Sequence, residues 1–146
     1  DIPQAFRAGR AAITLHHTTS DDAVKDAALA YILYCRDYLI NEVKLMQAGM
    51  ALHYLNDVKS KLAANAASPG SHTQNKINHS MSEAYAFIFG IAFISSEPDM
   101  TYGEVMAICD VLEPAISGFT MSSQSIDATI DQIAAATGLE TIKNDL

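Results

Sequence analysis

The fold is decided by the stretch NHSMSEAYAFIFGIAF, residues 78–93, in which His79 and Glu83 stand at the start of an almost wholly apolar run. Apolar residues on every side of a helix are typical of a helix at the centre of a bundle. The apolar run Ala84–Ile94 has eleven residues, which suits a core helix and falls short of the ~20 residues that a bilayer requires. We therefore expect a central helix here and no transmembrane segment in this chain.

The other long segments also show the spacing of apolar residues that is typical of helices. None alternates in the manner of a strand, and no Asn-Gly hairpin turn occurs. The sequence therefore predicts an all-α fold, a helical bundle of about five helices that forms a single domain over residues 1–146. The expected helices are Pro3–Leu15, Asp21–Ala66, Gln74–Ser95, one that begins after Thr101, and one that runs from about Ser125 to Gly138.

The longest of these helices carries a broad apolar stripe, with residues at steps of three or four. A stripe of this breadth predicts an inner helix that touches more than one neighbour. Glu42 and His53 fall within the same arc, so we expect His53 to lie on the buried seam. The stripe consists of Ala28, Ile32, Cys35, Leu39, Val43, Met46, Met50 and Tyr54, and it is widened by Tyr31, Tyr38, Leu45 and Leu52 at steps of seven.

Several residues are typical of helix ends. Asp21 suits an N-cap, and Thr101 with Glu104 forms the T-x-x-E pattern of a capping box. We expect Pro114 to kink or terminate its helix and Gly138 to follow the last helix as a C′ residue.

The composition excludes some partners. With 146 residues and a formal net charge of -8, the chain lacks the clustered Lys and Arg that a nucleic-acid phosphate backbone requires. The acidic surface also disfavours binding to anionic lipid. The two cysteines, Cys35 and Cys109, occupy apolar helical positions, which favours buried free thiols over a disulfide.

The candidate site is the pair His79 and Glu83, four residues apart on one helix face. Such a pair can hold a divalent metal such as iron or zinc if other helices add ligands, and His53 is the best further candidate. The commoner interpretation is structural, with His79 hydrogen-bonded at a helix end and His53 bonded to a carbonyl in the core. Both interpretations stay open at this point.

Catalytic motifs are scarce. The sequence contains no Gly-x-Ser-x-Gly elbow, no HExxH pair and no glycine-rich phosphate loop. A metallopeptidase would need a metal-bound water with Glu83 as the base, and Glu83 would then not be free to act as a ligand.

Three segments together resemble the C-terminal half of an imelysin-related family of bacterial envelope lipoproteins: AFRAGRAAI at 5–13, ALHYLN at 51–56 and HSMSEAYAFIFGIAF at 79–93. The resemblance implies an all-helical, imelysin-like fold in which two bundles from the two halves of a longer protein pack together. It also implies export to the periplasm or cell surface, with a lipid anchor on a cysteine that precedes this chain. The start at Asp1 agrees with a missing N-terminal half.

Imelysins proper carry the motif Gly-x-His-x-x-Glu at a proposed metal site, and the resemblance places its histidine at His79. Ile77 stands where that motif has glycine, and the acid follows four residues after the histidine, at Glu83. The related lipoprotein branch has a His followed by Ser-Glu-Ala, as in His79 and residues 82–84.

These observations favour a non-enzymatic cell-envelope protein that binds a ligand or partner through a helical module. The partner would be the missing N-terminal half or a second copy in a homodimer. The alternative is an imelysin-type module that binds iron or another divalent metal, and a metallopeptidase ranks third.

Overall fold

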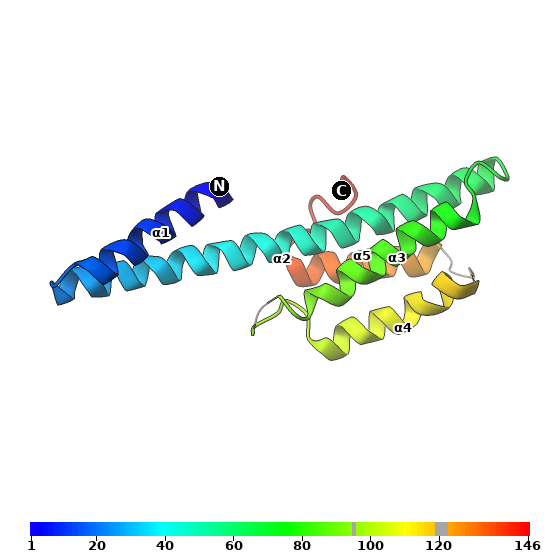
Figure 1. Ribbon diagram of the computed structural model, residues 1–146. Helices are drawn as coiled ribbons and strands as arrows, with labels where there is room; N and C mark the ends of the chain where they lie inside the picture. The colour runs from blue at the N-terminus through cyan, green and yellow to red at the C-terminus, as the bar shows by residue number, and fades with distance from the viewer. Residues whose placement is uncertain (95, 119–122) are drawn as a thin grey trace. The chain divides into compact units, whose positions relative to one another are not determined.

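The computed structural model describes residues 1–94, 96–118 and 123–146, and these residues form α-helices and no β-strand. The all-α class expected from the sequence is therefore confirmed. Within the same residues, no helix combines the length and the apolar character needed to cross a bilayer. The helices are α1 (Ile2–Thr18), α2 (Asp22–Ala67), α3 (Gln74–Ile91), α4 (Tyr102–Gly118) and α5 (Ser123–Thr137) (Figure 1).

The expected capping residues are present at three helix ends. The Asp21 carboxylate accepts hydrogen bonds from the amides two and three residues on, at 2.9 and 3.3 Å, and so caps α2. The Thr101 amide donates to the Glu104 carboxylate at 2.8 Å and the Glu104 amide donates to the Thr101 hydroxyl at 3.3 Å, which completes the capping box of α4. Gly138 follows α5 with φ of +73°, a conformation that favours glycine.

Three other helix ends differ from the expectation. Helix α1 continues through both histidines to Thr18, whose hydroxyl donates to the Thr14 carbonyl at 2.9 Å. Helix α3 ends at Ile91, and Ser95, where we expected the end, lies outside the described residues. Helix α4 runs through Pro114 to Gly118 and is not terminated by the proline.

The chain divides into two compact units, Asp1–Val43 and Lys44–Leu146, where the sequence led us to expect one bundle over all 146 residues. Helix α2 contributes its first part to one unit and its remaining part to the other. The expectation differed because the long apolar stripe of α2 gives no sign that the helix has different neighbours along its length.

The core of the unit Lys44–Leu146 is built from one face of each of its helices, and helices α3 and α4 lie side by side (Figure 1). Helix α3 buries one face and not all sides: Phe89 is 37% exposed. Its backbone lies close to α2 at Gly90, where Gln47 of α2 donates to the Phe87 carbonyl at 2.9 Å. Among the described side chains, the large ones that are fully buried are Leu52, Leu55, Val58, Ile77, Met81, Ile88, Val105, Cys109, Leu112, Ile126, Ile130 and Ile133.

The apolar stripe expected for α2 is wrong in part over its second half. Met46, which the stripe placed inside, is 57% exposed, whereas Leu52, which widened the stripe, is fully buried, as is Leu55, which the stripe did not include. In this part helix α2 is apolar on more than one face, so its periodicity alone does not indicate which face the other helices cover. The packing of α3, α4 and α5 determines which face is buried.

The C-terminal residues after α5 turn back onto α2. Asn56 donates from its side-chain amide to the backbone carbonyls of Lys143 and Leu146, at 2.6 and 3.3 Å. A further ion pair joins Lys143 to Asp131 of α5. The half-buried Asn56 amide therefore fastens the end of the chain to the unit.

The unit Asp1–Val43 is a hairpin of two antiparallel helices, α1 and the first part of α2 (Figure 1). The two helices approach closely at Gly9, where a Cβ atom would lie 3.4 Å from the Cβ of Cys35. Only three residues of this unit are buried, and all three are small: Ala12, Ala28 and Cys35. The hairpin therefore encloses very little apolar volume of its own.

Candidate functional site

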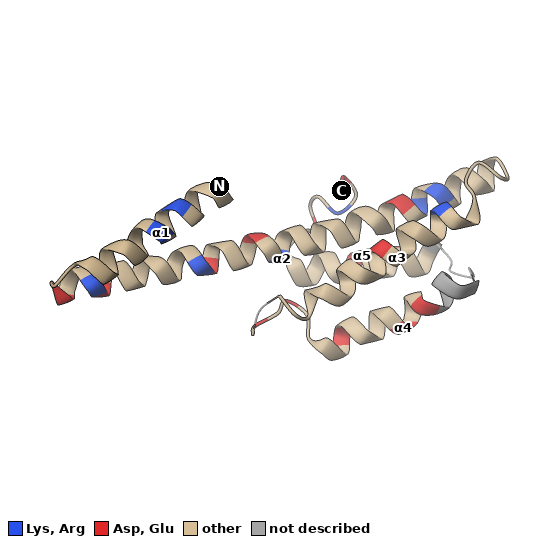
Figure 2. Cartoon of the chain, in the orientation of Figure 1, with Lys and Arg blue, Asp and Glu red and all other residues tan. Residues whose placement is uncertain are grey.

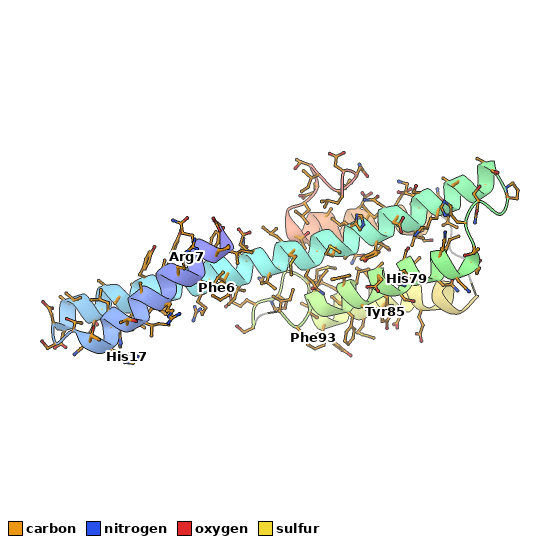
Figure 3. All side chains as sticks on the ribbon, turned by 45° about the horizontal axis from the view of Figure 1, so that its top comes forward. Phe6, Arg7, His17, His79, Tyr85 and Phe93 are labelled. Atoms are coloured by element: carbon orange, nitrogen blue, oxygen red, sulfur yellow. The ribbon has the colours of Figure 1, made fainter. Side chains whose placement is uncertain are left out.

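The histidine and the glutamate singled out by the sequence lie one turn apart on α3. His79 is exposed to solvent, and Glu83 is half-buried (Figure 3). Among the residues that the structure describes, no group of three or more His, Cys, Asp and Glu side chains is placed to hold a metal ion. The described side chains therefore offer a pair of ligands at most, and these do not by themselves fit a metal centre.

His53 does not lie on the buried seam where the sequence placed it. It is exposed, and its ring meets the edge of the Tyr54 ring, with centroids 5.3 Å apart. The buried face of α2 changes before this position, so a residue on the expected stripe points to solvent.

Glu42, the other polar residue of the expected stripe, lies in the hairpin. It forms a hydrogen bond with the Tyr38 hydroxyl, and this bond raises the pKa of Tyr38.

A polar cluster joins α2 to α3 in the second unit. Ser80, which is 1% exposed, donates to the Asp57 carboxylate at 2.6 Å and accepts from the Lys61 ammonium at 2.7 Å. Lys61 also pairs with Asp57 at 2.5 Å. Burial alone would raise the pKa of Asp57, but the hydrogen bonds from Lys61 and Ser80, with the charges of Lys61 and His53, hold that pKa below its usual range.

A serine next to a lysine invites comparison with a nucleophile and its base, and the geometry argues against that role. A general base must accept the proton of its nucleophile, whereas Lys61 donates hydrogen bonds to both the Ser80 hydroxyl and the Asp57 carboxylate. Ser80 is covered by the helices around it and donates to Asp57, so its oxygen has no open approach for a substrate. The cluster is therefore structural: each of its three side chains has hydrogen-bond partners, and these bonds hold α3 against α2.

The two cysteines are buried and free, as the sequence predicted. Burial raises the pKa of the Cys109 thiol, and the charges of Asp110 and Glu113 raise it further. A thiol with a raised pKa carries little thiolate near neutral pH and is chemically quiet. Cys109 therefore contributes packing to the core.

Among the side chains that the structure describes, the hairpin Asp1–Val43 exposes more large apolar residues than the other unit. Phe6 of α1 and Tyr34 of α2 are each 63% exposed. The second unit is more than twice as long and exposes fewer large apolar residues in its described part, with Met46 and Phe93 the most exposed. The large apolar residues exposed in the hairpin are Ile2, Phe6, Ile13, Leu15, Leu29, Tyr31, Leu33, Tyr34 and Val43.

One face of the hairpin is hollowed into a groove of about 460 Å³ between α1 and α2. Gly9 and Ile13 of α1 and Leu39 of α2 belong to its apolar lining. Arg10 and Arg36 are the charged residues of the lining, one from each helix. All three arginines of the chain lie in this hairpin, and α1 carries basic but no acidic residues (Figure 2). We call this feature, lined by Ala5, Phe6, Gly9, Arg10, Ile13, Ile32, Cys35, Arg36, Leu39 and Ile40, the arginine groove.

The arginines of this groove differ in their partners. Arg36 pairs with the adjacent Asp37 at 2.6 Å, yet its side chain stays 57% exposed. Arg10 is exposed, and no carboxylate in the described part of the chain forms an ion pair with it. Arg7, on the same helix, is exposed too but does not line the groove (Figure 3).

A second aromatic surface lies in the other unit. Phe93 stands 5.1 Å from Phe89 and 5.9 Å from Tyr102, measured between ring centroids. All three rings are exposed, Phe93 by 60%. This cluster is small, and its rings pack against one another. It is therefore a weaker candidate for a binding surface than the hairpin.

Sequence reasoning missed both main features of the structure. The Asp57–Lys61 spacing of four residues was visible as a helical ion pair, but the partner Ser80 is revealed only by the register of two helices. The groove could have been suspected from Phe6, Arg10 and Ile13, which recur at helical spacing on one face of α1.

Comparison with family models, with curated proteins and with solved structures gave no match.

Proposed function

We propose that this chain is a non-enzymatic, partner-binding helical module of the bacterial cell envelope, and that the hairpin Asp1–Val43 is its docking surface. The observation that carries the proposal is the contrast between what the hairpin buries and what it exposes. It buries two alanines and a cysteine, and it exposes nine large apolar side chains. Most of the stability of helices in proteins comes from tertiary packing of an apolar face, so this hairpin gains most from a partner that covers it.

The size of that gain supports the proposal. Burying an apolar side chain fully contributes about 1.5–3 kcal/mol, so covering the half-exposed side chains of the hairpin would contribute on the order of 10 kcal/mol in gross terms. Association costs at least several kcal/mol in lost freedom. The gross gain is of the same order as this cost, so a stable complex requires a partner that covers most of these side chains.

The envelope location and the imelysin-like relationship rest on the resemblance of residues 5–13, 51–56 and 79–93 to that lipoprotein family. The alternative function is a module that binds iron or another divalent metal through His79 and Glu83. This alternative would need ligands beyond the described residues, because these bring no third ligand to the pair. A metallopeptidase would need the same ligands and a catalytic base besides.

Site-specific photo-crosslinking in cells that produce the native protein tests the proposal. A benzophenone side chain replaces Phe6 or Tyr34 in the hairpin, and the matched control replaces Ile142, which is 43% exposed in the other unit. We expect adducts of one defined mass from Phe6 and Tyr34, none from Ile142, and recovery of the protein with the envelope fraction. Equal labelling from all three positions, or no adduct from the hairpin, would overturn the proposed docking surface.

A further inference from the structure

The arginine groove is about as long as the part of a helix that docks in a groove. On α1 its lining runs from Ala5 to Ile13. Eight steps at 1.5 Å correspond to about 12 Å, or two helical turns. A helix that docks in a groove inserts side chains at positions i, i+3, i+4 and i+7, which also cover about two turns. The groove is open along its length, so an extended partner fits it better than an enclosed small molecule.

The lining of the groove is largely apolar and includes Gly9. Because α1 has no side chain at Gly9, its backbone approaches Cys35 of α2 closely, and Phe6 and Ile13 line the groove on the same helix. An apolar ridge of a partner helix would find aliphatic contacts from both helices in the groove. Such ridge-in-groove contact is the usual way in which helices pack.

The charges at the groove select among partners. Arg10 on α1 and Arg36 on α2 bring positive charge to its lining from two different helices, and no acidic side chain lines it. Arg10, which has no carboxylate partner among the described residues, attracts carboxylates, with which an arginine makes paired hydrogen bonds. Arg36 already pairs with Asp37 but stays 57% exposed, so it adds a weaker attraction. The chain as a whole has a formal net charge of -8, so this concentration of arginine runs against its general composition.

The same charges argue against a second copy of this groove as the occupant. In a symmetric dimer that joins two arginine grooves, each surface meets its own copy. Arg10 and Arg36 of one chain would then face a second set of like charges, which costs free energy at a desolvated interface.

We infer, on the basis of the proposed docking function, that the arginine groove receives an amphipathic α-helix of another polypeptide, with apolar residues seated on Gly9 and Ile13 and flanking carboxylates paired with Arg10 and Arg36. The apolar ridge supplies most of the affinity. The two arginines fix the register of the helix and reject basic partners.

The test uses two synthetic helical peptides of about 20 residues, long enough to hold helical structure. Both carry leucine at i, i+3, i+4 and i+7; one has glutamates on the flanks of the leucine stripe, and the other has lysines. Binding to the purified chain is measured by fluorescence anisotropy. We expect the glutamate peptide to bind about tenfold more tightly than the lysine peptide, with a difference that shrinks as salt is added.

Charge reversal at matched positions locates the contact. Arg10→Glu should weaken binding of the glutamate peptide about fivefold or more and improve binding of the lysine peptide, whereas Arg7→Glu, outside the groove on the same helix, should change either by less than about twofold. Circular dichroism checks that both variants keep their helix content. Equal binding of the two peptides, or equal effects of the two variants, would overturn the inference.

Two further outcomes separate this inference from the proposed function. If neither peptide binds and sedimentation shows a dimer that Ile13→Glu dissociates, a second copy occupies the face, and the inferred partner is wrong while the docking function stands. If neither peptide binds, the chain stays monomeric and Phe6 yields no crosslink in cells, both the inference and the proposed function fail.

Discussion

Ser80 of α3 and Asp57 of α2 are joined by a hydrogen bond of 2.6 Å, and Lys61, one turn further along α2, contacts both. A buried hydroxyl between two charges would be costly if any of the three lacked its partner. All three are satisfied, so the cluster stabilises one register of α3 against α2. This relationship leads to two predictions about stability.

We expect Ser80→Ala to lower the free energy of unfolding by about 1–2 kcal/mol, because it removes two hydrogen bonds to charged groups. The matched control is Ser82→Ala. Both hydroxyls lie within hydrogen-bond distance of the carbonyl four residues back, at 3.2 Å for Ser80 and 2.8 Å for Ser82. Only Ser80 reaches α2, where it donates its proton to Asp57 and accepts from Lys61. Urea unfolding of the two variants measures the difference. Equal losses would mean that the contact with α2 contributes nothing.

We expect Asp57→Asn to reduce the sensitivity of the protein to acid. The pKa of Asp57 is lowered in the folded state from the ordinary value of 3.8, so the stabilisation is present above that value and is lost as the pH falls through the folded pKa. The wild type should therefore exceed Asp57→Asn in stability at about pH 7, and the gap should narrow toward about pH 3. Because the Asp57 side chain is 34% exposed, we expect a gap of only about 1 kcal/mol. A gap that is the same at both pH values would contradict this assignment.

We expect the effect of Gly90→Ala to depend on Gln47. A Cβ atom at Gly90 would lie 2.1 Å from the Nε2 atom of Gln47, so Gln47 must move and give up its hydrogen bond to the Phe87 carbonyl. That loss of about 1 kcal/mol offsets the gain of about 1 kcal/mol from replacing a helical glycine by alanine. In a Gln47→Ala background the same substitution should stabilise the protein by about 1 kcal/mol.

Unfolding of the four proteins of this double-mutant cycle gives the coupling directly. Gly103→Ala is the control, because a Cβ atom there meets nothing within 4 Å. Its effect should be the same in the wild type and in the Gln47→Ala background. Strict additivity of the Gly90 and Gln47 substitutions would show that the close approach at Gly90 has no energetic consequence.

We expect His79→Ala to leave the metal content of the purified protein unchanged. His79 is exposed, and the described residues add no third ligand to it and Glu83. Elemental analysis of protein purified without chelator measures the content, and His17→Ala is a control at another exposed histidine. Stoichiometric iron or zinc that is lost in His79→Ala and kept in His17→Ala would favour the metal-binding alternative.

The helix ends that could be predicted are those set by neighbours in sequence. These capping residues interact with neighbours only a few positions away, so their residue types and spacing are enough to predict the helix ends. They are Asp21, Thr101 with Glu104, and Gly138. The end of α1 was placed too early, because two histidines and a threonine weaken a helix without stopping it.

The buried face of α2 could not be predicted in the same way. Met46 and Leu52 are both apolar and both fit a helical stripe, yet one is 57% exposed and the other is fully buried. The difference arises from the helices packed against α2, which are distant in sequence. The misplacement of His53 follows from the same cause.

The candidate site was located only in part. His79 and Glu83 were correctly placed on one helix, but the polar cluster around Ser80 and the arginine groove each require two helices in register. A single sequence shows spacing within a helix and not the rotation of one helix about its neighbour.

The central claim is that the hairpin Asp1–Val43 is incompletely packed without a partner, and hydrogen–deuterium exchange of the isolated chain tests it most directly. We predict that the amides of α1 exchange at least about a hundredfold faster than those of Leu52, Leu55 and Ile88, because local opening of the hairpin exposes little additional apolar surface. Protection of α1 equal to that of Leu52 and Ile88, at a concentration where the protein is monomeric, would contradict the claim.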